Sequence, residues 1–100
     1  KREMALRLAA EFAANRARDE ALHDPLTNMP NRRALSEAVS AALSQPDPAH
    51  RSHALVMFDL NGFKSVNDHY GHPVGDRVLQ EIAGRLEAAA GPAKMSARIG

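Results

Sequence analysis

A chain of 100 residues fits one domain of ordinary size and leaves little room for a second. Hydrophobic residues make up 44% of it and charged residues 25%, a balance that argues against both a disordered chain and a membrane-spanning one. The 13 Lys and Arg residues nearly balance the 12 Asp and Glu residues, so the formal charge of +1 offers no general attraction for nucleic acid.

Residues 1–23 are rich in Ala, Leu, Arg and Glu and contain no Gly or Pro, which predicts one long helix. Small and apolar residues recur in it at spacings of four and three, namely Leu6, Ala10, Ala13 and Ala17. A short coiled-coil seam would explain this pattern, and so would a helix packed on its own domain. We favour the dimer stalk slightly, and we divide the chain into a linker helix at 1–23 and a domain portion at 24–100.

A proline-containing turn separates this helix from a second one. The residue before a proline is pushed away from helical geometry, so Asp24 before Pro25 ends the first helix, and Asn28 to Asn31 reads as a turn and a helix start. From Arg32 to Leu43, residues at helical spacing predict a helix with one buried face, made of Leu35, Ala38, Val39, Ala42 and Leu43. The following stretch 45–53 predicts a surface loop, and we expect its His50 and His53 to be solvated rather than metal-bound.

The second half of the chain alternates strand and helix signals. Ala54 to Phe58 is a continuous apolar run, typical of a strand buried on both faces. A short helix from about Gly62 to His69 follows, and Gly71 and Pro73 mark a stop and a restart.

A longer helix is predicted from about Val74 to Ala90, with an apolar stripe formed by Val78, Ile82 and Leu86. Lys94 to Ile99 reads as another short strand. The order of elements predicts an α/β sandwich whose sheet is unfinished at Gly100, so that more strands are expected downstream.

Asp59 stands at the carboxyl end of the predicted strand, where α/β proteins usually bind ligands and where Mg²⁺ finds its carboxylates. An isolated Asp there would more often form a turn or a cap. Gly62 shifts the balance, because it lets the backbone approach a ligand, and the amides of Phe63 and Lys64 then lie at a helix N-terminus that favours phosphate. The alternative for Lys64 is a weak surface pair with Asp68.

Asn67 can both donate and accept hydrogen bonds, and Asp76 can accept two N–H bonds, so together they suit the edge of a guanine base. Each alone would more often cap or compensate a helix end. Their occurrence together with Gly71 and Gly75 carries the hypothesis. The motifs of P-loop and Rossmann nucleotide sites and the nucleophile elbow of hydrolases are absent from the sequence, which argues against those classes.

Two segments resemble the GGDEF domains of diguanylate cyclases. DPLTNMPNRRAL, Asp24 to Leu35, resembles the D-x-L-T-x-L-x-N-R motif that joins a signalling helix to the first domain helix. FDLNGFKSVNDHYGHPVGDRVL, residues 58–79, resembles the family pattern throughout its length, and SARIG, residues 96–100, resembles the segment before the signature. The resemblance covers about residues 20–100 and implies a sandwich like nucleotide cyclases and polymerase palms, with a central, mainly antiparallel sheet and a long N-terminal signalling helix.

This resemblance implies an enzyme that condenses two GTP molecules into cyclic di-GMP across two facing domains, hence a homodimer. Asp59 and the Leu60 carbonyl would hold Mg²⁺, or Mn²⁺ in its place, and Phe63 and Lys64 would contact the phosphates. Asn67 and Asp76 would read guanine, by the same resemblance. The catalytic acidic residue is expected beyond Gly100, so we expect the 100 residues alone to be inactive.

The family also implies partners and an alternative function. An upstream sensor, and in some members a downstream phosphodiesterase domain, would accompany the domain, and a degenerate domain would bind GTP and regulate that output without turning GTP over. We expect a cytoplasmic location, with any membrane tether supplied by the sensor, no membrane contact by this segment and no nucleic-acid partner. The absence of cysteine suits a reducing compartment.

The sequence departs from the family pattern at two places before its end. Position 61 is Asn where many members carry Asp, a variant that also occurs in the family and that we do not expect to inactivate the domain. The product-inhibition motif R-x-x-D is replaced by residues 91–94, Gly-Pro-Ala-Lys, so product feedback through that site is predicted to be absent.

Overall fold

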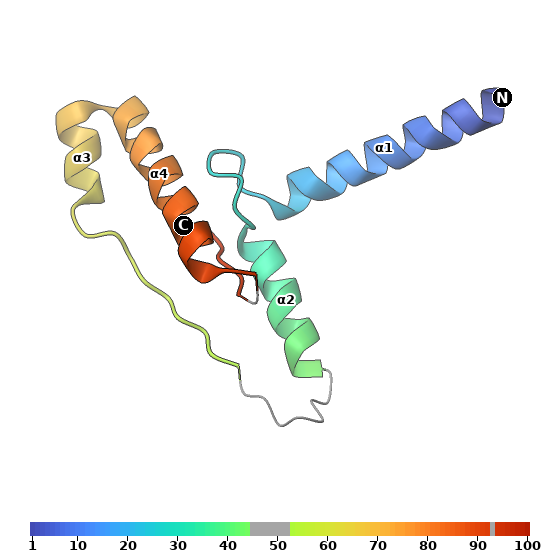
Figure 1. Ribbon diagram of the computed structural model, residues 1–100. Helices are drawn as coiled ribbons and strands as arrows, with labels where there is room; N and C mark the ends of the chain where they lie inside the picture. Colours follow the sequence, from blue (N-terminus) through green and yellow to red (C-terminus); the bar gives the residue numbers. More distant parts are fainter. Residues whose placement is uncertain (45–52, 93) are drawn as a thin grey trace.

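The computed structural model describes residues 1–44, 53–92 and 94–100, and in that part of the chain its regular elements are helices (Figure 1). They are α1 (Arg2–Leu22), α2 (Arg32–Ser44), α3 (Phe63–Tyr70) and α4 (His72–Ala90). The four helices predicted from the sequence are therefore confirmed, with ends that differ by at most two residues. The predicted loop at 45–53 lies almost wholly outside the described residues, as does His50.

Helix α1 projects away from the other helices, which it meets only at its C-terminal end (Figure 1). None of its residues is buried, and its large apolar side chains stay open to solvent, with Leu6 67% and Phe12 70% exposed. Local helix propensity and the ion pair of Arg16 with Glu20, 3.5 Å apart, stabilise this helix along its exposed length. The dimer stalk stays a prediction. No helix among the described residues has the length and apolar character of a membrane span.

The two predicted strands are wrong for this structure. Neither Ala54–Phe58 nor Lys94–Ile99 is a strand, and the described residues contain a single antiparallel bridge, between His23 and Pro30. The first segment is extended but exposed, with Phe58 62% accessible, instead of buried on both faces. An apolar run predicts a segment that can be buried, whereas a strand also requires a neighbouring backbone for its hydrogen bonds.

The apolar face predicted for the second helix is also wrong, because α2 has no buried residue and Leu43 is 75% exposed. The buried apolar side chains of the described residues are Met29 and Ala83. The radius of gyration is 18.0 Å, against about 13 Å for a compact domain of this length. The arrangement is open, and the sheet expected for an α/β sandwich is incomplete in the part of the chain that the structure describes, as predicted.

Helices α3 and α4 form a tight pair joined at Gly71. This residue has φ 89° and ψ 160°, a conformation that residues with a side chain rarely adopt. Its N–H donates to the Asn67 carbonyl at 2.8 Å and ends α3, while Pro73 follows in the first turn of α4, where its missing N–H costs nothing.

A network of hydrogen bonds organises residues 23–31, here called the junction loop. One carboxylate oxygen of Asp24 accepts from the N–H and the hydroxyl of Thr27, at 2.9 and 2.8 Å. The Asp24 N–H donates to the Met29 carbonyl at 2.7 Å, and the Asn28 N–H donates to the Asp24 carbonyl at 2.8 Å. The loop thus folds back on itself around the buried side chain of Met29.

Asn31 joins the junction loop to the helices on both sides. Its side-chain oxygen accepts from the N–H of Ala34 at 3.0 Å and so caps α2. Its side-chain nitrogen donates to the Ala21 carbonyl at 2.9 Å, and its backbone N–H donates to the Leu22 carbonyl at the same distance. The C-terminus of α1 and the N-terminus of α2 therefore share one residue.

Arg98 connects the junction loop with the last residues of the chain. One guanidinium nitrogen of Arg98 lies 3.1 Å from both carboxylate oxygens of Asp24. The backbone N–H of Arg98 donates to the Pro30 carbonyl at 2.9 Å. The two side chains are 28% and 18% exposed, so the ion pair is partly shielded from solvent. Burial raises the pKa of Asp24, but the hydrogen bonds from Thr27 and the hydrogen bond and charge of Arg98 outweigh it and leave this pKa below its ordinary value.

We expect Gly71→Ala to lower the free energy of unfolding by about 1 to 3 kcal/mol, because alanine would be strained at this backbone conformation. Urea unfolding of the full natural protein measures the change. Gly84→Ala is the matched control, since Gly84 lies in α4 with no atom within 4 Å of an added Cβ. Equal stability of the two variants would contradict the assigned strain.

We expect Asp24→Asn to cost about 1 to 3 kcal/mol, because the variant loses the charge that Arg98 and Thr27 stabilise. The folded pKa lies below the ordinary value of 3.8, so the contribution is present above that value and is lost as the pH falls through the folded pKa. Unfolding followed from neutral pH down to acid should therefore show a steeper loss of stability for the wild type than for the variant. Parallel curves would argue against this role of Asp24.

Candidate functional site

The predicted ligand residues lie on the extended segment before α3 and on the α3–α4 pair. Asp59 is exposed, and one of its carboxylate oxygens accepts from the Leu60 N–H at 2.9 Å. Leu60 is half-buried. Gly62 follows as the N-cap of α3 in the left-handed conformation, with φ 78° and ψ 8°, and nothing lies within 4 Å of the position of its missing Cβ. The chain can therefore turn sharply into α3 with its backbone open on this side.

Phe63 and Lys64 are the first two residues of α3. The Val66 N–H is bonded within the helix, to the Gly62 carbonyl at 3.2 Å. The N–H groups of Phe63 and Lys64 precede it and have no acceptor in their own helix, which is the arrangement that favours an anion. Lys64 is exposed, and no ion pair with Asp68 is found among the described residues, so the alternative of a simple surface pair is not observed.

Asn67 lies on the face of α3 that contacts α4. Its side-chain oxygen is buried and is the one buried side-chain polar atom of the described residues without a hydrogen-bond partner. It lies directly against Gly75 of α4, which is itself buried. The α4 residue after Gly75 is Asp76, whose side chain is exposed.

The simpler explanations for Asn67 and Asp76 as helix caps find no support here. The backbone carbonyl of Asn67 accepts the Gly71 N–H, but neither helix has a side-chain cap hydrogen bond at its N-terminus. A negative charge compensates the helix dipole best within the first turn, and Asp76 lies beyond the first turn of α4. The Asp76 carboxylate and the nitrogen of the Asn67 amide are left for another role, whereas the Asn67 oxygen is buried against Gly75.

The structure brings Phe63, Asn67 and Gly75 into one cluster, with Asp76 beside it. Asp59 forms no hydrogen bond with Asn67 or Asp76 among the described residues. In the sequence, Gly75 stands out only as part of the order of loops and helices, and its contact with Asn67 was not predicted. A glycine early in a helix, eight residues after a polar side chain, was the available signal, and it does not by itself indicate a contact.

The residues at Asp59 can contribute to a divalent-cation site without forming one alone. Among the described residues, no group of three or more His, Asp or Glu side chains could hold a metal ion. Mg²⁺ commonly uses one or two carboxylates and takes its other ligands from water and substrate phosphates. An exposed carboxylate and a neighbouring backbone carbonyl, close in sequence to a helix N-terminus, fit this mode of binding.

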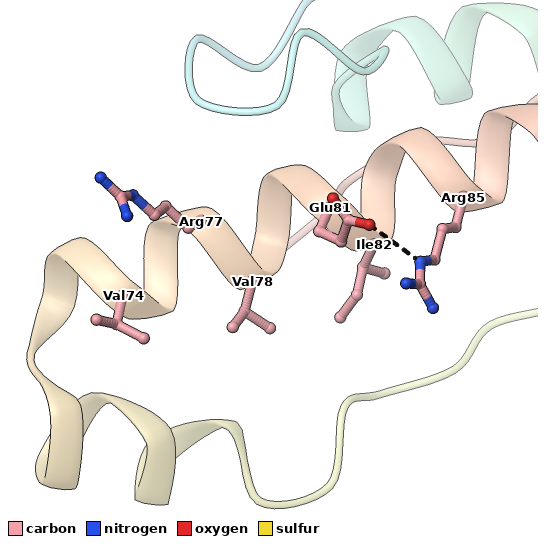
Figure 2. Close-up of a pocket in the computed structure, with 6 residues that line it drawn as sticks. All are labelled: Val74, Arg77, Val78, Glu81, Ile82 and Arg85. Carbon is pink, nitrogen blue, oxygen red and sulfur yellow. Dashed lines mark hydrogen bonds and ion pairs between the residues drawn. The ribbon is translucent and has the colours of Figure 1, made fainter.

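A separate depression on α4 contains none of these predicted residues (Figure 2). It has a volume of about 440 Å³ and is lined by Val74, Arg77, Val78, Glu81, Ile82 and Arg85. Figure 2 shows that Val74, Val78 and Ile82 lie along one side of the helix, while Glu81 and Arg85 form an ion pair at 3.2 Å. This depression follows part of the predicted apolar stripe of α4, through Val78 and Ile82, and its charged lining residues Glu81 and Arg85 are paired with each other.

Comparison with known proteins identifies one family. The sequence model described as "Diguanylate cyclase, GGDEF domain" matches residues 21–100. The bifunctional diguanylate cyclase/cyclic di-GMP phosphodiesterase MucR of Pseudomonas aeruginosa is 44% identical over 80 residues, which are 80% of this chain and 12% of MucR. Diguanylate cyclase DgcN of Escherichia coli is 42% identical over 80 residues, 80% of this chain and 19% of DgcN. The chain thus spans less than a fifth of these relatives.

A solved structure agrees with the sequence comparison. The coiled coil and GGDEF domain of DgcB from Caulobacter crescentus, crystallised in complex with c-di-GMP, superposes with a TM-score of 0.83 at 26% sequence identity. The match covers 98% of this chain and 51% of the DgcB chain. The long N-terminal helix and the helices after it therefore share the arrangement of the coiled coil and GGDEF domain of DgcB.

Proposed function

Because the chain belongs to the GGDEF domain family of diguanylate cyclases, we propose that it binds GTP and forms half of a site that condenses two GTP molecules into cyclic di-GMP. The observation that carries this proposal is the position of the polar family residues. They lie at the start of α3 and where α3 meets α4, each in a place that physical chemistry favours for part of a nucleotide.

The triphosphate would lie at the N-terminus of α3. The N–H groups of Phe63 and Lys64 point along the helix axis toward that end, and the helix dipole adds a partial positive charge. The exposed ammonium of Lys64 has no partner among the ion pairs of the described residues and would add a full charge. These groups would bind phosphate oxygens and hold the α-phosphate in place for attack.

The base would lie where α3 and α4 meet. The exposed carboxylate of Asp76 can accept the two N–H groups on one edge of guanine, and Asn67 can supply a further hydrogen bond. Adenine offers no such pair of donors on that edge. The arrangement would therefore select guanine over adenine.

Asp59 and the Leu60 carbonyl would hold Mg²⁺, or Mn²⁺ in its place, between the extended segment and the phosphates. Such an ion would offset the charge of the phosphate oxygens and make the α-phosphate easier to attack. The role of Asp59 is to supply the negative charge that keeps the cation beside the nucleotide. The Leu60 N–H bond to Asp59 fixes the orientation of that carboxylate.

Condensing two GTP molecules requires two such domains that face each other, so we propose a homodimer. The apolar side chains exposed along α1 support a role of this helix in the pairing. An upstream sensor acting through α1 would regulate the approach of the two half-sites. We propose that the domain itself lies in the cytoplasm.

The alternative is a domain that binds GTP and regulates an attached phosphodiesterase. The similarity to MucR supports this alternative, because the name of MucR combines a diguanylate cyclase with a cyclic di-GMP phosphodiesterase. Asp59, Asn67 and Asp76 would bind the nucleotide in either case. Turnover of GTP distinguishes the two functions.

We expect the full natural protein, supplied with Mg²⁺, to convert two GTP molecules into cyclic di-GMP and two pyrophosphate ions, detected by chromatography, and Asp59→Ala to reduce the rate about a hundredfold or more. Glu87→Ala is the control, because it removes an exposed carboxylate of α4 that has no part in the proposed site, and it should keep the wild-type rate. GTP binding without product would establish the regulatory alternative, and absence of GTP binding would refute both functions.

We also expect cyclic di-GMP to leave the initial rate unchanged at product concentrations up to about ten micromolar. Residues 91–94 lack the Arg and the Asp of the product-inhibition motif, and Ala93 among them lies outside the described residues. Rates measured with added product provide the test. Strong inhibition at low product concentration would place a feedback site elsewhere in the protein.

A further inference from the structure

Gly75 faces the side chain of Asn67 so closely that no side chain would fit between them. A Cβ added at Gly75 would overlap the Asn67 side-chain oxygen, and it would lie 2.8 Å from Asn67 Cγ and 3.3 Å from Phe63 Cζ. The first two contacts are closer than real Cβ atoms approach their neighbours. The glycine therefore leaves a space that the end of the Asn67 side chain fills.

Space, and not backbone conformation, explains the glycine at this position. Gly75 lies inside α4 and is absent from the residues with positive φ, which include Gly62 and Gly71. Alanine would favour the helix more than glycine does. Gly84 of the same helix has no atom within 4 Å of an added Cβ, so the crowding is specific to Gly75.

The contact fixes which end of the Asn67 amide a ligand can reach. The side-chain oxygen is buried against Gly75 and has no partner among the described residues. An amide whose oxygen is buried in this way has only its nitrogen left to offer, and that nitrogen is a donor. Asn67 would therefore donate to an acceptor of the base, while Asp76 accepts from the base.

We propose that Gly75 is a positioning residue that orients the Asn67 amide and thereby sets the preference of the site for guanine. This inference rests on the proposed function, because it concerns the same nucleotide. Alanine at position 75 would displace the Asn67 amide, which is the far end of a flexible side chain. Gly75→Ala would therefore weaken the hydrogen bond of Asn67 to the base, and the helices would stay folded.

The experiment measures the affinities of nonhydrolysable GTP and ATP analogues, with Mg²⁺, by titration calorimetry on the full natural protein. We expect Gly75→Ala to weaken the GTP analogue about tenfold and to reduce the GTP-to-ATP preference by a similar factor. Gly84→Ala, the same substitution at an open position of α4, should change neither value. In an Asn67→Ala background, Gly75→Ala should have no further effect, because the crowded amide is gone.

Other results would overturn the inference. Unchanged affinity and preference in Gly75→Ala would do so, as would an equal loss for both analogues that persists in the Asn67→Ala background, since either places the effect outside Asn67. Unfolding of Gly75→Ala, seen by circular dichroism, would make the contact a matter of packing alone. A wild type that binds no guanine nucleotide would refute the proposed function, and this inference with it, whatever the variants do.

Discussion

The arrangement of the junction loop and the helices joined to it depends on the hydrogen bonds that the Asp24 carboxylate accepts. This carboxylate accepts hydrogen bonds from Thr27 within the junction loop and from Arg98, 74 residues further along the chain. Asn31 in the same loop holds the end of α1 and the start of α2. The structure is open and has few buried side chains, so these polar contacts hold segments together that a large apolar core would hold in a compact domain. A shielded charge pair suits this task, because its geometry is specific.

The sequence predicted what depends on local interactions and failed where distant parts must meet. The helix formers of residues 1–23 and the turn at Pro25 indicated α1 and its end, because propensity and backbone sterics act over a few residues. The apolar run before Asp59 carried no information about a neighbouring strand, and none lies beside it among the described residues. Arg98 gave no sign of its bond to Asp24, since no spacing rule links residues so far apart.

The site follows the same division. Residue type and order indicated Asp59, Lys64, Asn67 and Asp76 as candidates, and the family match covers all of them. The hydrogen bonds of the structure were needed to test their ordinary alternatives as caps or surface pairs. The contact between Asn67 and Gly75 depends on how two helices pack, which is a property of the pair and not of either helix. Sequence patterns thus indicate chemical groups more readily than the neighbours that orient them.

The length of α1 gives the junction loop a mechanical meaning. A helix of 21 residues measures about 30 Å, so a rotation of about ten degrees at Asp24 carries its far end through about 5 Å. The helix is thus a long lever whose fulcrum is bonded to Arg98, two residues from Gly100. A weak sideways force at the N-terminus would act near this point as a larger force over a much smaller distance. The partner of Asp24 therefore lies where small, forceful movements would be delivered.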